Sequence, residues 1–475
     1  MIKKIINLKT LYLLLIILFG IPSIIHIINS GFLLESKEYF HFFINGMEQE
    51  VSTFFNGLIY FTFFALMFGI YFLFLKKKDK LFNNMKGLII FILLISISFA
   101  IILPITSSDV LSYATTGEIQ SKYGANPYYD TINDIKGENN TEKNEILNSI
   151  TIWDDQLVIY GPLWSLICGI VTFFSFSKVS IVLILFKTLA IVIHIINCIL
   201  IYKMTKKKFW VIFYGLNPYV LFETISNVHN DLYIVFFTLL ALYFLINKKN
   251  LVVTLIFLAC AACIKYITVL LVPIILIYYY RKENIGKRVL KCIKSGLLFT
   301  FFVILLYLIY LRNFEMIFYV FIQQNKYRES IWAALYFWCY NLGNLEIVKI
   351  LSRSVAIICL ILYIIFILKL LFKKDINFRE IMKKWNIILL VFILGYISNL
   401  CVWYFVWLFA TVAWQSAKNV RIVMYLPFIY ELLVSKYFFL GGEWASKSYG
   451  FSIVAIIFLI TLINLNKLKK VKLLE

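Results

Sequence analysis

Long apolar runs recur along this chain from residue 10 to residue 466, and many approach the ~20 residues that a helix needs to cross a bilayer. Of the 475 residues, 62% are hydrophobic and only 15% are charged, and the mean hydropathy is +0.87. Soluble globular domains do not have this composition. We therefore predict an all-α, polytopic transmembrane helical bundle that forms a single integral membrane domain over residues 1–475.

The apolar runs predict about fourteen crossings of the membrane. The expected spans are 10–29, 52–75, 87–106, 180–202, 209–226, 231–247, 250–264, 266–280, 295–311, 350–372, 386–400, 402–415, 421–435 and 449–466. An even number of crossings places both termini on the same side of the membrane.

The basic residues indicate which side that is. The net charge of +21 would point to nucleic acid in a soluble protein, but in a membrane protein it is typical of cytoplasmic loops. With the amino terminus placed inside, 32 of the 46 Lys and Arg residues fall on the cytoplasmic side. We predict a multi-pass cell-membrane protein with both termini cytoplasmic, no nucleic-acid partner, and sizeable outer loops at 30–51, 107–157 and 312–349.

The segment "LVIYGPLWSLICGIVTFFSF", residues 158–177, is apolar enough to cross the membrane. If it crossed, the basic run at 206–208 would lie outside. We therefore predict a re-entrant helix that enters from the outer face and returns, which requires cover by protein or a cavity.

Ionisable groups in or near a membrane cost several kcal/mol unless they are paired or face water, so each one needs a reason. Asp109, in "PITSSDVLSY", follows the span 87–106. It is either a helix cap together with Ser107 and Ser108, which spacing alone favours, or a general base at the membrane surface. Asp154 and Asp155 precede "YGPLW" and form either a solvated turn before a helix or the rim of a carbohydrate site.

The segment "NPYVLFETISNVHND", residues 217–231, contains a second group of such residues. Its Asn-Pro pair breaks the helical pattern, and Glu223 follows near the outer end of the span. His229, Asn230 and Asp231 form the outer turn, where Asp231 can cap the next helix. Capping does not explain Glu223 or His229, so we interpret this segment as the wall of a sugar-phosphate site.

Several cations lie outside the expected charge pattern or within a span. Lys187 and His194 lie seven residues apart on one helix face, and Lys187 is near enough to the outer end to snorkel. Lys265, Arg312 and Arg328 map to the outer side, either as scattered surface charges or as a cationic pocket for phosphate.

These segments follow one another in a familiar order. An aspartate after an early span precedes "YGANPYY", "WDD" and "YGPLW", then "NPYVLFETISNVHND", the lysine of "CIKYITVLLVP" and finally "VWYFVW". In this order, over residues 104–410, the chain resembles the bacterial polyprenol-phosphate-mannose-dependent α-1,6-mannosyltransferases of the GT-C superfamily.

The resemblance implies a GT-C-like fold with its active site at the extracytoplasmic face. It implies transfer of a hexose, in this family mannose, from a polyprenyl-phosphate donor to a glycan or glycolipid acceptor, with inversion. Asp109 matches the position of the family's catalytic base. Many relatives have an acidic pair there, whereas this chain has Ser108 before Asp109.

The remaining roles follow from this mechanism. Donor-phosphate binding is expected of Lys265, Arg328 and Arg312, and sugar or acceptor binding of His229, Asn230, Asp231, Glu223, Asp154, Asp155 and Tyr160. No cofactor is required if these cations neutralise the leaving phosphate, although a divalent metal stays open. Two other functions stay open as well: a transporter or flippase of a lipid-linked sugar, and a polysaccharide polymerase or ligase.

Overall fold

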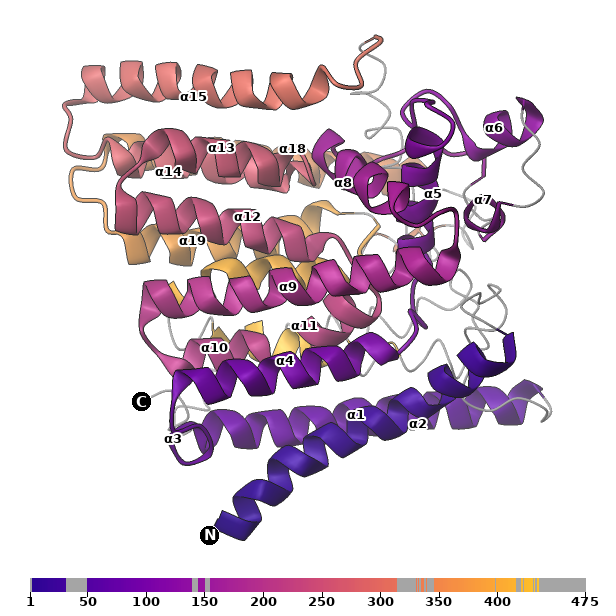
Figure 1. The fold of residues 1–475 in the computed structure, drawn as a ribbon. Coiled ribbons are helices and arrows are strands. Elements are labelled where there is room, and N and C mark those ends of the chain that lie inside the picture. Colours follow the sequence, from indigo (N-terminus) through magenta and orange to yellow (C-terminus); the bar gives the residue numbers. More distant parts are fainter. Residues whose placement is uncertain are drawn as a thin grey trace. The chain divides into compact units, whose positions relative to one another are not determined.

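The structure is a computed structural model that describes residues 2–30, 49–138, 144–149, 154–313, 346–397 and 399–415, with parts of 330–339 and 420–434. Within these ranges the chain is helical and contains no β-strand, which confirms the all-α prediction (Figure 1). The predicted spans at 421–435 and 449–466 and the predicted loops at 30–51 and 312–349 lie partly or wholly outside the described residues.

Among the described residues, six helices are long and apolar enough to cross a membrane. They are Leu8–Asn29, Phe54–Lys76, Val179–Thr205, Asp231–Lys248, Ile285–Tyr307 and Glu346–Phe372. Several other predicted spans form shorter apolar helices, so the fourteen crossings are not confirmed.

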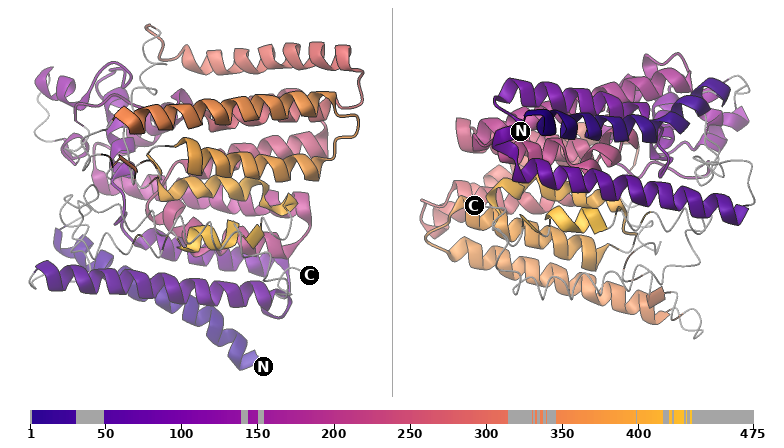
Figure 2. Two further views of the ribbon diagram at one scale, coloured as in Figure 1. Left: turned by 180° about the vertical axis from the view of Figure 1, so that it is seen from behind. Right: turned by 90° about the horizontal axis from the view of Figure 1, so that it is seen from below.

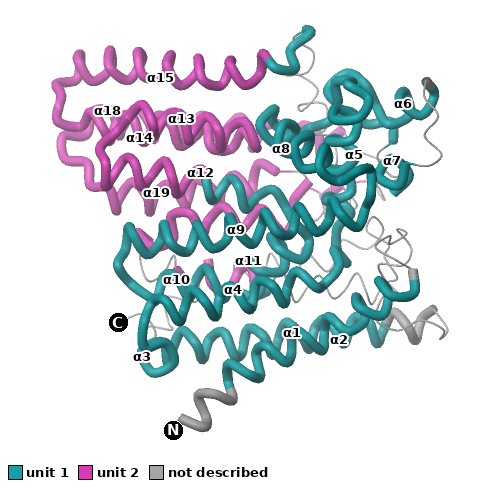
Figure 3. The backbone as a smooth tube through the Cα atoms, viewed as in Figure 1, with its two compact units in different colours: residues 1–236, 309–316, 428–442 teal, residues 237–308, 317–427, 443–475 magenta. Residues whose placement is uncertain are grey.

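The chain divides into two compact units (Figure 3). Unit 1 consists of residues 1–236, 309–316 and 428–442, and unit 2 of the rest. The helices of unit 1 are α1 (Ile2–Ser30), α2 (Gln49–Lys76), α3 (Lys78–Leu81), α4 (Met85–Ile101), α5 (Asp109–Ser121), α6 (Ile132–Glu138), α7 (Glu145–Asn148), α8 (Pro162–Phe173), α9 (Val179–Thr205), α10 (Lys208–Gly215), α11 (Pro218–Leu221), the π-helix η2 (Phe222–Ser226) and the start of α12 (Asp231–Tyr243).

The described part of unit 2 contains the end of α12, then η3 (Phe244–Lys248) and eight further elements. They are α13 (Leu251–Ala262), η4 (Tyr266–Leu270), α14 (Leu271–Tyr279), α15 (Ile285–Tyr307), α18 (Glu346–Phe372), α19 (Phe378–Val391), η6 (Phe392–Tyr396) and η7 (Val402–Trp414). Helix α13 packs on α15, and α19 packs on η7.

In unit 1, the long helices α1, α2, α4 and α9 lie side by side, with α1 against α2 and α4, and α4 against α9 (Figure 2). Lys187 of α9 is buried and donates from Nζ to the backbone carbonyls of Ala100 and Ile102. These carbonyls lie at the end of α4, where intrahelical partners run out. Lys187 therefore satisfies the carbonyl groups at the end of α4 and does not extend to the surface. His194 is also buried, and its Nε2 lies 3.2 Å from the Gly215 carbonyl oxygen.

Helices α5 and α8 pack together unusually closely. A Cβ atom at Gly117 of α5 would lie 2.3 Å from both the Cys168 carbonyl oxygen and Thr172 Oγ1 of α8. Only glycine allows this approach. The contact holds the start of the 107–157 loop against the segment that follows that loop.

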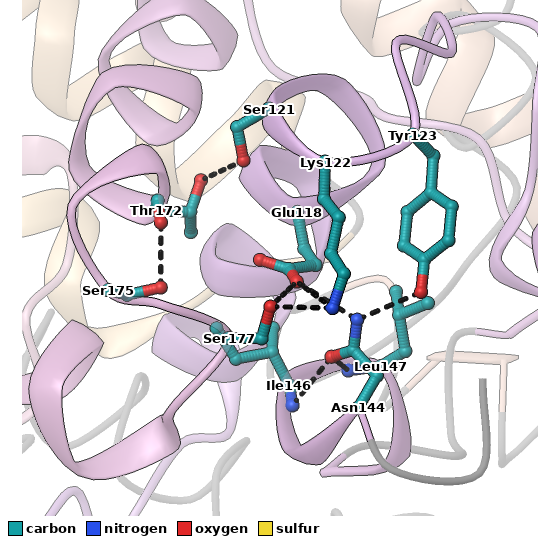
Figure 4. Close-up of polar contacts among 10 residues, drawn as sticks. All are labelled: Glu118, Ser121, Lys122, Tyr123, Asn144, Ile146, Leu147, Thr172, Ser175 and Ser177. Atoms are coloured by element: carbon teal, nitrogen blue, oxygen red, sulfur yellow. Dashed lines mark hydrogen bonds and ion pairs between the residues drawn. The ribbon is translucent and has the colours of Figure 1, made fainter.

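A buried carboxylate ties the far end of α5 to its neighbours (Figure 4). Glu118 Oε1 accepts from Ser177 Oγ at 2.5 Å and from Asn144 Nδ2 at 2.9 Å, and Lys122 Nζ lies 3.9 Å away. Ser177 follows α8, and Asn144 caps α7 by accepting from two backbone amides. The cluster therefore joins α5 to α7 and to the turn after α8.

Helix α8 occupies the predicted re-entrant segment. Its twelve residues span about 18 Å, which is short of the ~30 Å hydrocarbon core. Beyond it, Phe176 and Ser177 adopt left-handed backbone with φ of 54° and 59°, and the chain turns into α9. This length and turn fit a helix that does not cross the membrane, which stays a prediction.

Candidate active site

Asp109 is the first residue of α5, and the N-cap position before it is Ser108, which makes no side-chain capping bond. The Asp109 carboxylate instead lies among side chains from other parts of unit 1. Its Oδ2 accepts from the Tyr160 hydroxyl at 3.3 Å and from the Tyr113 hydroxyl at 3.4 Å. The cap hypothesis holds for Ser107, whose Oγ accepts from the Asp109 N–H at 3.2 Å, while the Asp109 carboxylate also accepts from these two hydroxyls. Its side chain is 20% exposed, so a ligand can reach it.

His229 lies between Asp109 and a second carboxylate. Its Nδ1 is 3.4 Å from Asp109 Oδ2, and its Nε2 is 3.2 Å from Glu223 Oε2. The imidazole is fully buried, and Glu223 is 2% exposed. Three of the predicted site residues, from two segments more than a hundred positions apart, thus form a carboxylate–imidazole–carboxylate array.

This array determines the charge of the imidazole. Burial alone would lower the pKa of His229, because it penalises the charged form. The two carboxylates of Asp109 and Glu223, 3.4 and 3.2 Å from the ring nitrogens, outweigh burial and raise the pKa from 6.5 to about 9. His229 is therefore an imidazolium at neutral pH.

The local backbone departs from regular helix on both sides of these residues. Asn217 caps α11 by accepting from the amides of Tyr219 and Val220, and Pro218 occupies the first helical position, so the predicted break at Asn-Pro is present. Glu223 then lies in the π-helix η2, an element often found at functional sites. Val228, just before His229, has φ of +60°, which is strained for a β-branched residue.

The neighbours of His229 in sequence are also buried. Asn230 and Asp231 have no exposed surface, and α12 begins at Asp231. Among the described residues, neither polar atom of the Asn230 amide has a hydrogen-bond partner, nor does the Tyr233 hydroxyl. Unsatisfied buried polar groups are uncommon and mark places where a ligand or water completes the bonding.

Asp154 and Asp155, the acidic pair after Trp153, contact side chains of α6 and have no described contact with Asp109. Asp154 Oδ2 lies 3.1 Å from Lys136 Nζ, and Asp155 accepts from Asn133 Nδ2. Both partners belong to α6, so these contacts stay within the 107–157 loop. Of the residues predicted around "YGPLW", only Tyr160 has a described contact with Asp109.

The predicted phosphate-binding cations belong to different parts of the chain, and each is described by its own contacts. Arg312, in unit 1, is 58% exposed and lies 3.7 Å from Asp130 Oδ2. Lys265, in unit 2, joins α13 to η4, and its Nζ lies 4.9 Å from the ring centre of Tyr404 and 5.7 Å from that of Trp407. Arg328 lies outside the described residues. Lys265 thus contacts the "VWYFVW" segment through cation–π interactions, which links two of the motifs within unit 2.

Residue-by-residue analysis of the sequence missed three residues that support the array: Tyr113, Asn227 and Thr106. Tyr113 could have been found, because it lies one helical turn after Asp109. Asn227 donates from Nδ2 to Thr106 Oγ1 at 2.7 Å and to Glu223 Oε2 at 3.3 Å, and no sequence signal predicts that pairing.

Within the described ranges, no group of three or more His, Cys, Asp and Glu side chains is arranged to hold a metal ion.

Comparison with protein families places this site in context. The model of the MptA_B family, described as "Alpha-(1->6)-mannopyranosyltransferase, N-terminal domain", matches residues 24–281. The match covers more than half of the chain, includes Asp109, Glu223, His229 and Lys265, and confirms the resemblance that the motif order predicted. No curated protein and no solved structure matches the chain.

Proposed function

The chain belongs to the alpha-(1->6)-mannopyranosyltransferase family, so it is a glycosyltransferase that transfers mannose, and we propose that its donor is a polyprenyl-phosphate mannose and its acceptor an extracytoplasmic glycan or glycolipid. The observation that supports this proposal most directly is the position of Asp109. It is a partly exposed carboxylate at the start of α5, eight residues beyond the end of the apolar helix α4. A base at that position meets an aqueous acceptor and a lipid-borne donor.

In the proposed reaction, Asp109 takes the proton from an acceptor hydroxyl. The acceptor oxygen attacks the anomeric carbon from the side opposite the phosphate and forms the new glycosidic bond. The bond between that carbon and the phosphate oxygen breaks, and polyprenyl phosphate leaves with the electron pair. Configuration at the anomeric carbon is inverted.

The leaving phosphate gains negative charge as its bond breaks, so a fixed cation nearby lowers the barrier. Lys265 is our first candidate, because its ammonium group is held against two aromatic rings. We retain Arg312 and Arg328 as further candidates, and Asn230, Asp231, Asp154, Asp155 and Tyr160 as candidates for contacts with the sugar or acceptor. The unpartnered amide of Asn230 matches the needs of a sugar hydroxyl, which both donates and accepts.

The other two functions have less support. A transporter or flippase of a lipid-linked sugar needs polar groups along a path across the membrane, and family membership favours transfer chemistry instead. A polymerase or ligase would use a pyrophosphate-linked donor, which the donor comparison below distinguishes.

The replacement Asp109→Asn tests the proposed base. Removal of a general base lowers turnover by about 10²–10⁴-fold, because no other group takes the acceptor's proton in the transition state. Transfer of labelled mannose from polyprenyl phosphate would be measured with purified protein in lipid nanodiscs. The matched control is Asp134→Asn, an exposed carboxylate of α6 whose described bonds are to Thr131 in its own turn. Turnover in Asp109→Asn close to that of the control would refute the role of Asp109.

The donor is tested in the same assay with three forms of labelled mannose: on polyprenyl phosphate, on polyprenyl pyrophosphate and on a soluble nucleotide. We expect transfer from the monophosphate lipid alone. Transfer from the nucleotide sugar would disprove the lipid donor while leaving mannosyl transfer in place.

A further inference from the structure

Both ring nitrogens of His229 face carboxylates, and none of its surface is exposed. Glu223 is nearly as buried, and its Oε2 also accepts from Asn227 Nδ2 at 3.3 Å. The His229 side chain therefore has no exposed surface for a sugar, and the groups nearest to its two nitrogens are carboxylates of the protein. These two residues therefore require a role different from the sugar contact that the sequence predicted.

We propose that His229 and Glu223 are positioning residues for Asp109: the imidazolium of His229 orients and ionises the catalytic carboxylate, and Glu223 keeps that imidazolium in place and protonated. This proposal rests on the proposed role of Asp109 as the base. It assigns to the array a linear order in which only Asp109, at its exposed end, meets the acceptor.

The surrounding backbone supports a fixed geometry. Val228 holds a left-handed conformation directly before His229, and Glu223 lies in a π-helix. Two hydrogen bonds then fix the segment to α4 and to the chain beyond it, from Ser226 Oγ to the Phe99 carbonyl at 2.8 Å and from Asn227 Nδ2 to Thr106 Oγ1 at 2.7 Å. Strained backbone held in place on both sides is characteristic of functional sites.

The charges explain why two carboxylates are needed. Without Glu223, the full positive charge of His229 would act on Asp109. It would stabilise the ionised carboxylate of Asp109 so strongly that Asp109 would be a poor base. Glu223 shares the positive charge, so Asp109 stays ionised and can still accept the acceptor's proton. During the reaction that proton goes to Asp109, and His229 keeps its own proton.

Other ionisable groups face the array and do not replace these roles. Tyr113 and Tyr160 donate to Asp109 and are neutral near pH 7. Asp231 acts electrostatically on Tyr113, and Tyr60, which donates to Glu431, lies within electrostatic range of Glu223. All of these groups are acids, so His229 is the cation of this set.

The test compares the pH dependence of kcat and KM in Glu223→Gln and His229→Gln with wild type. We expect kcat to fall about 10- to 100-fold in each variant, with KM for donor and acceptor within about twofold, because orientation is lost and sugar contacts are not. Activity of the wild type should decline as pH rises through the pKa of His229. In Glu223→Gln that decline should move to lower pH by at least one unit, because a charge that keeps His229 protonated is gone.

The matched control is Glu118→Gln, which removes a buried carboxylate from α5 whose described partners are Ser177, Asn144 and Lys122. It should leave the pH profile unchanged. A raised KM with unchanged kcat in the His229 or Glu223 variants would overturn the proposal in favour of a sugar contact. An unmoved pH profile in Glu223→Gln would overturn it as well.

A second measurement does not depend on activity. The chain has four histidines, so ¹⁵N-histidine spectra of the protein in nanodiscs can be assigned by subtraction with His229→Gln. We expect an imidazolium that persists above pH 8 in wild type and in the conservative variant Glu223→Asp. An imidazole that is neutral at pH 7 would refute the proposal even where Glu223→Gln does not fold. If Asp109→Asn keeps its activity while the His229 imidazolium persists, Asp109 is not the base. The paired arrangement of His229 and Glu223 is then still supported.

Discussion

At His229, the contacts with two carboxylates make protonation part of the protein's stability. Its pKa is raised from 6.5 to about 9, so the stabilisation is complete below pH 6.5 and is lost as pH rises to about 9. Each pKa unit corresponds to about 1.4 kcal/mol, which gives a contribution of about 3 kcal/mol.

We therefore expect the melting temperature of the wild type to fall between pH 6.5 and 9 by several degrees more than that of His229→Gln. Thermal unfolding in detergent, followed by intrinsic fluorescence across this range, measures the difference. Parallel curves for the two proteins would contradict a charged His229.

The residues of the site were predictable from the sequence, but their contacts were not. Asp109, Glu223 and His229 were identified because an ionisable group near the membrane is costly without a purpose. Their roles were not predictable, because burial and pairing decide whether a histidine meets a ligand or another side chain. Asp154 and Asp155 were identified on the same ground, and the structure pairs them with side chains of α6, which residue type alone did not predict.

At the scale of elements, the contact between α5 and α8 positions Asp109, because α5 begins at that residue. Gly117→Ala would place a methyl group 2.3 Å from a backbone carbonyl of α8, so one of the helices must shift. Overpacking of this kind costs about 1–3 kcal/mol. We expect a lower melting temperature and reduced mannosyl transfer.

The control for this prediction is Gly137→Ala in α6, where an added Cβ meets nothing within 4 Å. Alanine at an open helical position leaves stability unchanged or slightly improved. Equal melting temperatures for the two variants would show that α5 and α8 do not depend on the close approach.

Element boundaries were predictable where apolar runs are long and uninterrupted, as in α2 and α9. They were not where local backbone changes type. The span predicted at 209–226 divides into α10, α11 and η2, and the one predicted at 402–415 is the 3-10 helix η7. Hydropathy measures which residues avoid water, and it does not distinguish one hydrogen-bonded helix type from another.

At the scale of the whole molecule, the distribution of basic residues predicts the topology. Lys178 precedes α9 and Lys207 follows it, so the two residues should lie on opposite sides of the membrane if α9 spans it. With the native cysteines replaced, Lys178→Cys should react with an impermeant maleimide in intact cells, whereas Lys207→Cys should react only after permeabilisation. The reverse pattern would mean either that residues 158–177 cross the membrane or that the whole topology is inverted, with Asp109 on the cytoplasmic side.

The sequence by itself determined the class of the protein and its family, because hydropathy needs no knowledge of neighbours and the order of motifs is a property of the chain. It also singled out Asp109, Glu223 and His229. Only the tertiary structure decided that these three residues meet, that His229 faces two carboxylates, and that Lys265 lies against Tyr404 and Trp407. Such pairings depend on how helices distant in sequence pack and where their backbone bends, which no local pattern encodes.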